Sequence, residues 1–156
     1  MRRLGVVLLT AIATASVVLS AGCSKPKAAD LCSLIQTGEL PGQLEEGFPK
    51  PGDGEDKACR WETSDGTSLR TDLMAYGQAS ALGEVWNASP RTIADREVYV
   101  AARGFTEPGG PVIECSSVTQ HDKDALRMTL AVDEPRGDLC AELTTLLEKA
   151  LPRLTS

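Results

Sequence analysis

The 156-residue chain is long enough for one globular domain, and its 42% hydrophobic residues exclude a disordered polymer. Aromatic residues make up only 4%, so the core must be mostly aliphatic. The formal net charge is −6 and no basic stripe is visible, which excludes the surface of a nucleic-acid-binding protein.

Residues 1–22 show the order of features that defines a secretory signal peptide. Arg2 and Arg3 precede an uncharged apolar run over 4–19, which is short for a membrane-spanning helix. Small residues follow, and then Cys23. The order predicts export of the chain. An ordinary signal peptide with a free cysteine nearby remains the alternative to a lipid-modified Cys23.

The stretch "LSAGC" resembles a bacterial lipobox, whose cysteine receives a diacylglyceryl group and becomes the first residue of the mature protein. It departs from the pattern at Ser20, where leucine is favoured. The resemblance implies lipidation of Cys23 and a membrane-anchored protein on the extracytoplasmic face. Residues 1–22 would be removed, 23–29 would form a short tether, and 30–156 would form a single globular domain.

The first element of that domain is expected to be a helix, with Asp30 as N-cap before "LCSLIQ". Two alternating segments follow, 58–63 and 67–76, which is typical of strands with one buried face. Asp65-Gly66 between them is a hairpin signal. A two-residue turn there would pair Trp61 with Arg70 and bury charge. The hydrophobic phase therefore favours a three-residue loop over 65–67, which pairs Trp61 with Thr71.

The second half of the chain repeats the mixture of helices and strands. A helix is predicted over 78–88, and strands over 96–102, 111–119 and 124–132. A last helix, 138–151, starts at the N-cap Asp138 and ends before Pro152. Together these elements predict an α+β fold: an antiparallel sheet of about five strands with helices packed on one face. By analogy, this resembles a Mog1/PsbP-like arrangement.

Four cysteines remain beyond Cys23, and an even number in an exported domain implies disulfides. Three connectivities are possible. Cys59 and Cys115 lie in the middle of strands, whereas Cys32 and Cys140 lie one turn into helices. We favour the pairing of like with like, Cys59 with Cys115 and Cys32 with Cys140, over the two other connectivities.

Reactive thiols are the rival interpretation of these cysteines, because a helix N-terminus lowers the pKa of a thiol. The chain has no Cys-x-x-Cys, and its single histidine, His121, falls in a turn between strands. We therefore favour structural disulfides over a nucleophile or redox thiol.

The order of these motifs resembles a family of small actinobacterial secreted lipoproteins known only as a domain of unknown function. The resemblance rests on the lipobox, "DLCSL", "CRW", the strand cysteine and the terminal "DLCAEL", and runs from Asp30 to Leu154. This chain has Leu31 and Leu139 where the family often has proline. The resemblance implies location and fold, and it implies no activity.

No catalytic constellation, metal site or cofactor fingerprint is visible in the sequence, and none is predicted. A hydrolase that uses two of the 22 acidic residues stays open as an alternative. Asp53, Glu55 and Asp56 could bind calcium through oxygen ligands, but they lack EF-hand spacing, so an acidic solvated loop is favoured.

Two loops rich in glycine and proline, 40–57 and 103–111, carry the only two phenylalanines. Phe48 and Phe105 could bind a ligand there, although packing over the edge of the core is the favoured interpretation. We expect a non-enzymatic cell-surface binding module for a cell-envelope protein or a small ligand. An accessory subunit of a membrane complex is the alternative.

Overall fold

The computed structural model describes residues 31–52, 57–75, 77, 88–107 and 110–154. The predicted signal peptide over 1–22, Cys23 and the acidic residues at 53–56 lie outside the described residues. So does the helix expected over 78–88, apart from its last residue.

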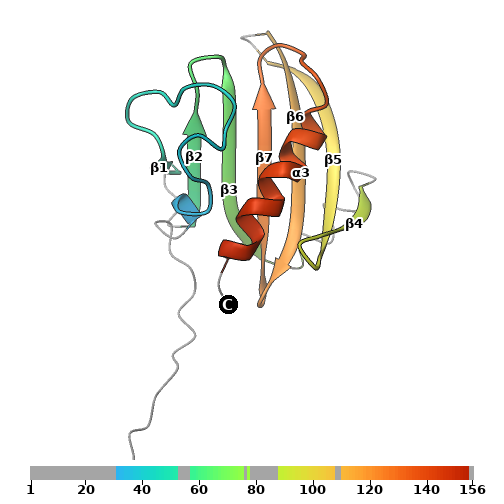
Figure 1. The fold of residues 1–156 in the computed structure, drawn as a ribbon. Helices are drawn as coiled ribbons and strands as arrows, with labels where there is room; N and C mark the ends of the chain where they lie inside the picture. The colour runs from blue at the N-terminus through green and yellow to red at the C-terminus, as the bar shows by residue number, and fades with distance from the viewer. Residues whose placement is uncertain (1–30, 53–56, 76, 78–87, 108–109, 155–156) are drawn as a thin grey trace, which may run out of the picture.

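The described chain forms a seven-stranded antiparallel sheet (Figure 1). The strands are β1 (Lys50–Pro51), β2 (Ala58–Glu62), β3 (Thr67–Ala75), β4 (Ser89–Ile93), β5 (Arg96–Glu107), β6 (Gly110–His121) and β7 (Asp124–Val132). Their spatial order is β1-β2-β3-β7-β6-β5-β4. The helix α3 (Leu139–Ala150) crosses one face of the sheet in front of β6 and β7, and a 3₁₀ turn, η1 (Leu151–Arg153), continues it.

The predicted fold class is wrong, and with it the Mog1/PsbP-like arrangement. The described residues form a sheet of seven strands with the single short helix α3, instead of about five strands under several helices. The expected first helix is helical only at Leu31 and Cys32 and then becomes a series of turns. Its apolar residues Leu31, Leu34 and Ile35 are buried, so one turn is enough to satisfy their spacing.

The edge strand β4 was not predicted from the sequence, because Pro90 indicated the end of a helix. The strand is joined to β5 by a two-residue turn in which Ala94 and Asp95 both have positive φ, 48° and 60°. Such turns usually carry Asn-Gly or Asp-Gly, so Ala-Asp gave no hairpin signal.

The β2–β3 hairpin confirms the predicted inward face but not the predicted register. Cys59 lies opposite Thr71, and Trp61 lies opposite Leu69, two residues away from the expected partners. The loop is Ser64-Asp65-Gly66, with Gly66 at φ 76°. A shift of two residues keeps every side chain on the same face, which is why the hydrophobic phase could not detect it.

The four cysteines of the domain form two disulfides, but not in the pairing that we favoured. Cys32 bonds Cys59, and Cys115 bonds Cys140. Cys59 and Cys115 lie on β2 and β6, which β3 and β7 separate. Three strand spacings put them about 14 Å apart, beyond the reach of a disulfide. Each bond instead joins the sheet to a segment that lies over it.

The core lies between the helix face of the sheet and the two segments that cover it. Residues from α3 and from 31–40 pack against Trp61 on β2 and Met128 and Leu130 on β7, all at most 1% exposed. The predicted last helix is confirmed: the Asp138 side chain accepts a hydrogen bond from Ala141 N at 3.1 Å, and the helix ends at Ala150. Leu154 follows η1 and is also buried.

The outer face of the sheet, opposite α3, carries ion pairs between neighbouring strands. Asp72 is 4% exposed and lies opposite Arg127, whose Nε donates to Asp72 Oδ2 at 3.1 Å. Arg70 Nε lies 3.4 Å from the same oxygen. The carboxylate of Asp72 therefore neutralises a local concentration of guanidinium groups on β3 and β7.

Replacing Asp72 by alanine is expected to lower the free energy of unfolding by about 2 kcal/mol, because Arg127 then loses a charge-assisted partner in a mostly buried position. Urea denaturation measures the effect. Arg60→Ala is the control, because its pair with Glu62 is exposed and should contribute about 0.5 kcal/mol. Equal losses in the two variants would contradict this role of Asp72.

Within the described ranges, no helix combines the length and apolar character needed to cross a membrane.

Candidate functional site

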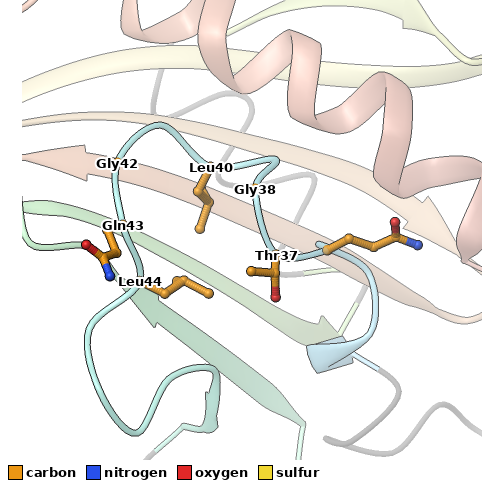
Figure 2. A pocket seen from close by; sticks show the side chains of 7 residues that line it. Thr37, Gly38, Leu40, Gly42, Gln43 and Leu44 are labelled. Carbon is orange, nitrogen blue, oxygen red and sulfur yellow. The ribbon is translucent and has the colours of Figure 1, made fainter.

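A cavity of about 370 Å³ lies within the loop that precedes β1. It is lined by Gln36, Thr37, Gly38, Leu40, Gly42, Gln43 and Leu44, and is called here the loop cavity. Figure 2 shows Leu40 and Leu44 pointing into the space between the two arms of the loop, with Thr37 on the facing arm. Leu40 is buried and Leu44 half-buried, whereas the other lining residues are exposed. The cavity thus has an apolar floor and a polar, uncharged rim.

The first arm of the loop is held by an ion pair with the C-terminal end of the chain. Arg153 donates from Nη1 to Glu39 Oε2 at 2.6 Å and from Nη2 to Glu39 Oε1 at 2.7 Å. Arg153 Nη1 also donates to Leu34 O at 2.8 Å, and Gln36 N donates to Glu39 Oε2 at 2.7 Å. A two-pronged ion pair of this kind fixes the position of the chain on both sides of Glu39.

The second arm is held by the β2–β3 hairpin. Ser64 N donates to Gln43 O at 2.9 Å, and Leu44 forms a β-bridge with Thr63. Gly42 has φ 88°, and a Cβ there would lie 2.9 Å from Asp65 Oδ1. Only glycine combines this backbone angle with so close an approach.

Asp65 is fixed in turn by its neighbours, so it forms a rigid support for the second arm. Its Oδ1 accepts hydrogen bonds from the hydroxyls of Thr63 and Thr67, and its Oδ2 accepts one from Arg136 Nη1 at 2.7 Å. The Thr63 hydrogen bond and then the Arg136 pair hold the pKa of this carboxyl well below its usual range. The loop cavity is therefore held by Arg153 near the C-terminal end and by the β2–β3 hairpin before any ligand binds.

The Glu39–Arg153 pair makes the first arm sensitive to acid. The hydrogen bond from Arg153 lowers the pKa of Glu39 from 4.5 to about 2. Because the folded-state pKa is depressed, the stabilisation is complete above pH 4.5 and is lost as the pH falls toward 2. We expect Glu39→Gln to lower the free energy of unfolding by about 1 kcal/mol at pH 7, since solvent screens the pair.

The measurement for Glu39 is chemical denaturation of wild type and Glu39→Gln between pH 2 and 7. The difference between their free energies of unfolding should be constant above pH 4.5 and should shrink toward pH 2. Glu148→Gln, an exposed acid on α3, is the control. If the difference in unfolding free energy between wild type and Glu39→Gln did not change with pH, the lowered pKa of Glu39 would be refuted.

A second cavity, of about 280 Å³, lies beside the hairpin and is polar. Its lining includes Glu45, Glu62 and Asp133 together with Arg60 and Ser68. Glu45 and Asp133 are exposed, and Glu62 pairs with Arg60. Catalytic carboxylic acids are held protonated by burial, and exposed carboxylates lack that feature. The described residues contain no cluster of three or more His, Cys, Asp or Glu side chains suited to hold a metal ion.

The residues proposed from sequence lie apart from the loop cavity. Phe48 is half-buried beneath Lys50, whose Nζ lies 4.7 Å from the ring centroid, and it lines neither cavity described above. Phe105 lies in β5 instead of in a loop, because β5 extends to Glu107. His121, expected in a turn, is the last residue of β6 and is buried, and its Nε2 has no hydrogen-bond partner among the described residues.

Sequence analysis missed the residues that line the loop cavity, although it marked the loop as unusual. The signal that was available is "QTGELPGQL", where two glycines and a proline interrupt the spacing of the buried leucines. The partner that positions the loop, Arg153, follows Glu39 by more than 100 residues, so no local pattern could have indicated the pair.

The comparisons with known proteins add little to this geometry. No family model matches the chain, and no curated protein matches it. A solved structure from Bacteroides thetaiotaomicron VPI-5482 is similar at 15% identity, with a TM-score of 0.45. The match covers 56% of this chain and 36% of the other, so this chain spans little more than a third of the length of that protein.

Proposed function

We propose that this protein is a lipid-anchored, non-enzymatic binding module on the extracytoplasmic face of the cell membrane, and that it holds a small ligand in the loop cavity. The observation that carries the proposal is the cavity itself, because its volume of about 370 Å³ is typical of sites that bind small molecules. The anchor rests on the resemblance of "LSAGC" to a lipobox and on the signal-peptide features of residues 1–22.

The lining of the loop cavity favours an uncharged ligand. The described residues that line it include no lysine, arginine, aspartate or glutamate. Glu39 lies within the same loop, but Arg153 occupies both of its carboxylate oxygens. Leu40 and Leu44 offer apolar contact, while Gln36, Thr37 and Gln43 can both donate and accept hydrogen bonds. A compact molecule with one apolar part and amide or hydroxyl groups fits this chemistry.

A protein partner for the same module, or a place as accessory subunit of a membrane complex, would instead use an exposed surface. The hydrolase alternative needs two converging carboxylates in a cleft. In the polar cavity, Glu45 and Asp133 are exposed and the half-buried Glu62 pairs with Arg60, so the cavity does not favour that alternative.

The test is native mass spectrometry of the lipidated protein extracted from membranes. Wild type is expected to carry a small molecule of defined mass. Thr37→Trp should lose it, because the indole fills the space between the arms of the loop. Thr145→Trp is the matched control, because Thr145 is an exposed threonine on α3 away from the cavity. A wild type without bound ligand, or equal occupancy in both variants, would contradict the proposal.

The anchor is tested separately by replacing Cys23 with serine. The wild-type protein should remain with the membrane pellet and carry the diacylglyceryl mass on Cys23, whereas the variant should appear in the soluble fraction. Two acyl-chain signals suffice for stable anchoring, so the change should be nearly complete. Equal membrane association of both proteins would exclude the lipid anchor and leave the ligand proposal standing.

A further inference from the structure

The loop cavity lies close in the chain to the proposed lipid anchor. Cys23 precedes Leu31, where the described chain begins, by eight positions, which span at most about 28 Å. Leu31 is fully buried and Cys32 is bonded to Cys59 on β2, so this end of the described chain is fixed to the sheet. The cavity lining begins at Gln36, and Figure 1 shows the start of the described chain and the following loop on the same flank, beside β1 and β2. An anchored domain would therefore hold the cavity near the bilayer surface, where lipids are the abundant small molecules.

The apolar floor of the cavity has room for one hydrocarbon chain. Leu40 and Leu44 point into the space between the two arms of the loop (Figure 2). The cavity volume of about 370 Å³ lies near the lower end of the range for small-molecule sites, about 300–1,000 Å³. A volume of this size suits a single-chain amphiphile better than a lipid with two chains.

The rim of the cavity is suited to hydroxyl groups. Glu39 N donates to Gln36 O at 3.1 Å and Gly38 has φ 89°, two features of a type II turn. The middle peptide of such a turn bonds to neither end, and no described residue is a hydrogen-bond partner of Thr37 O or Gly38 N. With the side chains of Gln36, Thr37 and Gln43, the rim thus offers uncharged donors and acceptors together. A hydroxyl, which both donates and accepts, complements such a rim.

A charged head group finds no counterpart at this rim. The described lining residues carry no charged side chain, and Arg153 occupies both carboxylate oxygens of Glu39. The net charge of −6 also repels anionic lipids from the chain as a whole. A neutral glycerol head group with one acyl chain satisfies the requirements of both the rim and the floor.

We propose that the loop cavity binds a monoacylglycerol from the bilayer, with the glycerol hydroxyls at the rim and the acyl chain on Leu40 and Leu44. This inference rests on the proposed function, because it names the chemical class of the small ligand. A lipidated Cys23 would carry the same glycerol and acyl groups, but with two chains. The free single-chain lipid is therefore the occupant that the volume favours.

The experiment titrates the Cys23→Ser protein, which lacks the anchor, with monoacylglycerols of increasing chain length below their micelle concentrations. The affinity should rise about fourfold for each added CH₂ until the floor is covered, and then level off. Lysophosphatidic acids with the same chains should bind about tenfold more weakly or less, because their charge has no partner at the rim. Lipidated wild type in phosphatidylcholine nanodiscs should bind the same neutral lipids. Loss of binding there would mean that the anchor itself fills the cavity, which would overturn the choice of a free lipid.

Leu44→Ser should remove most of the dependence on chain length, because it takes apolar surface from the floor. The matched control is Leu73→Ser, the same change at a half-buried leucine of β3 outside the cavity lining, which should keep that dependence. Circular dichroism checks that each variant remains folded.

The outcomes separate this inference from the proposed function. If native mass spectrometry finds a small ligand on wild type but monoacylglycerols do not bind, this inference fails and the proposed function stands. The inference also fails if affinity is independent of chain length, if the charged lipids bind equally well, or if both serine variants behave alike. If wild type carries no ligand and no lipid binds, both fail.

Discussion

Replacing Cys32 and Cys59 together by alanine is expected to lower the free energy of unfolding by about 3.5 kcal/mol and to release the loop that forms the cavity. The disulfide closes a separation of 27 residues, and its loss returns that chain entropy to the unfolded state. Cys32 is also the covalent link between the sheet and the segment that carries the loop cavity. Amides of 36–44 should therefore exchange much faster than in wild type.

The second disulfide provides a control of nearly equal size. Cys115 and Cys140 are separated by 25 residues, so removing both by alanine should cost about the same 3.5 kcal/mol. That bond joins β6 to the start of α3, and neither cysteine is among the described residues that line the loop cavity. The two double variants should thus be equally destabilised, while only the first loses the protection of 36–44 in hydrogen exchange.

Equal exchange rates for 36–44 in the two variants would show that the Cys32–Cys59 bond does not position the cavity. In that case Arg153 and the hairpin would hold the loop alone. Comparing the variants at matched distance from their denaturation midpoints removes the shared effect of lower global stability.

Local patterns predicted five of the seven strands and the last helix, but they predicted a first helix where the chain forms only one helical turn, for a physical reason. The alternation of Leu126, Met128 and Leu130 depends only on one buried face, and β7 spans the predicted 124–132. The turn after Leu31 has the same apolar spacing as a helix, yet the carbonyl of Leu34 accepts a hydrogen bond from Arg153. A distant side chain thus takes the place of the next helical turn, and that competition is invisible in the local sequence.

The disulfide pairing failed for a related reason. The inward face of Cys59 and the position of Cys140 near a capped helix start were both predicted correctly. Disulfide pairing, however, depends on which strands are neighbours. β7 inserts between β3 and β6, which puts two strands between Cys59 and Cys115. Strand order arises from the packing of the whole sheet, so a single sequence offered no means of choosing among the three connectivities.

Among the single substitutions proposed for the described core, Trp61→Ala should lower the free energy of unfolding most. The expected loss is about 3–5 kcal/mol, because the cavity left by the indole cannot close. Trp61 is 1% exposed on β2 and belongs to the cluster that also buries Leu31, Leu34 and Leu40. These leucines attach the cavity-bearing segment to the sheet. Their loss of contact should loosen the loop cavity as well as the core.

Two further variants separate the packing of this segment from general destabilisation of the core. Trp61→Phe keeps most of the apolar volume, so its free energy of unfolding should fall by less than about 2 kcal/mol. Leu143→Ala opens a cavity beneath α3, which contacts the half of the sheet that includes β5, β6 and β7, and should lose about 2–5 kcal/mol. Urea denaturation gives the energies. At matched stability, Trp61→Ala should raise exchange at 36–44 more than Leu143→Ala, because Trp61 lies on β2, which joins the segment through the Cys32–Cys59 bond. Equal exchange in the two variants would mean that the sheet and the segment open as one unit.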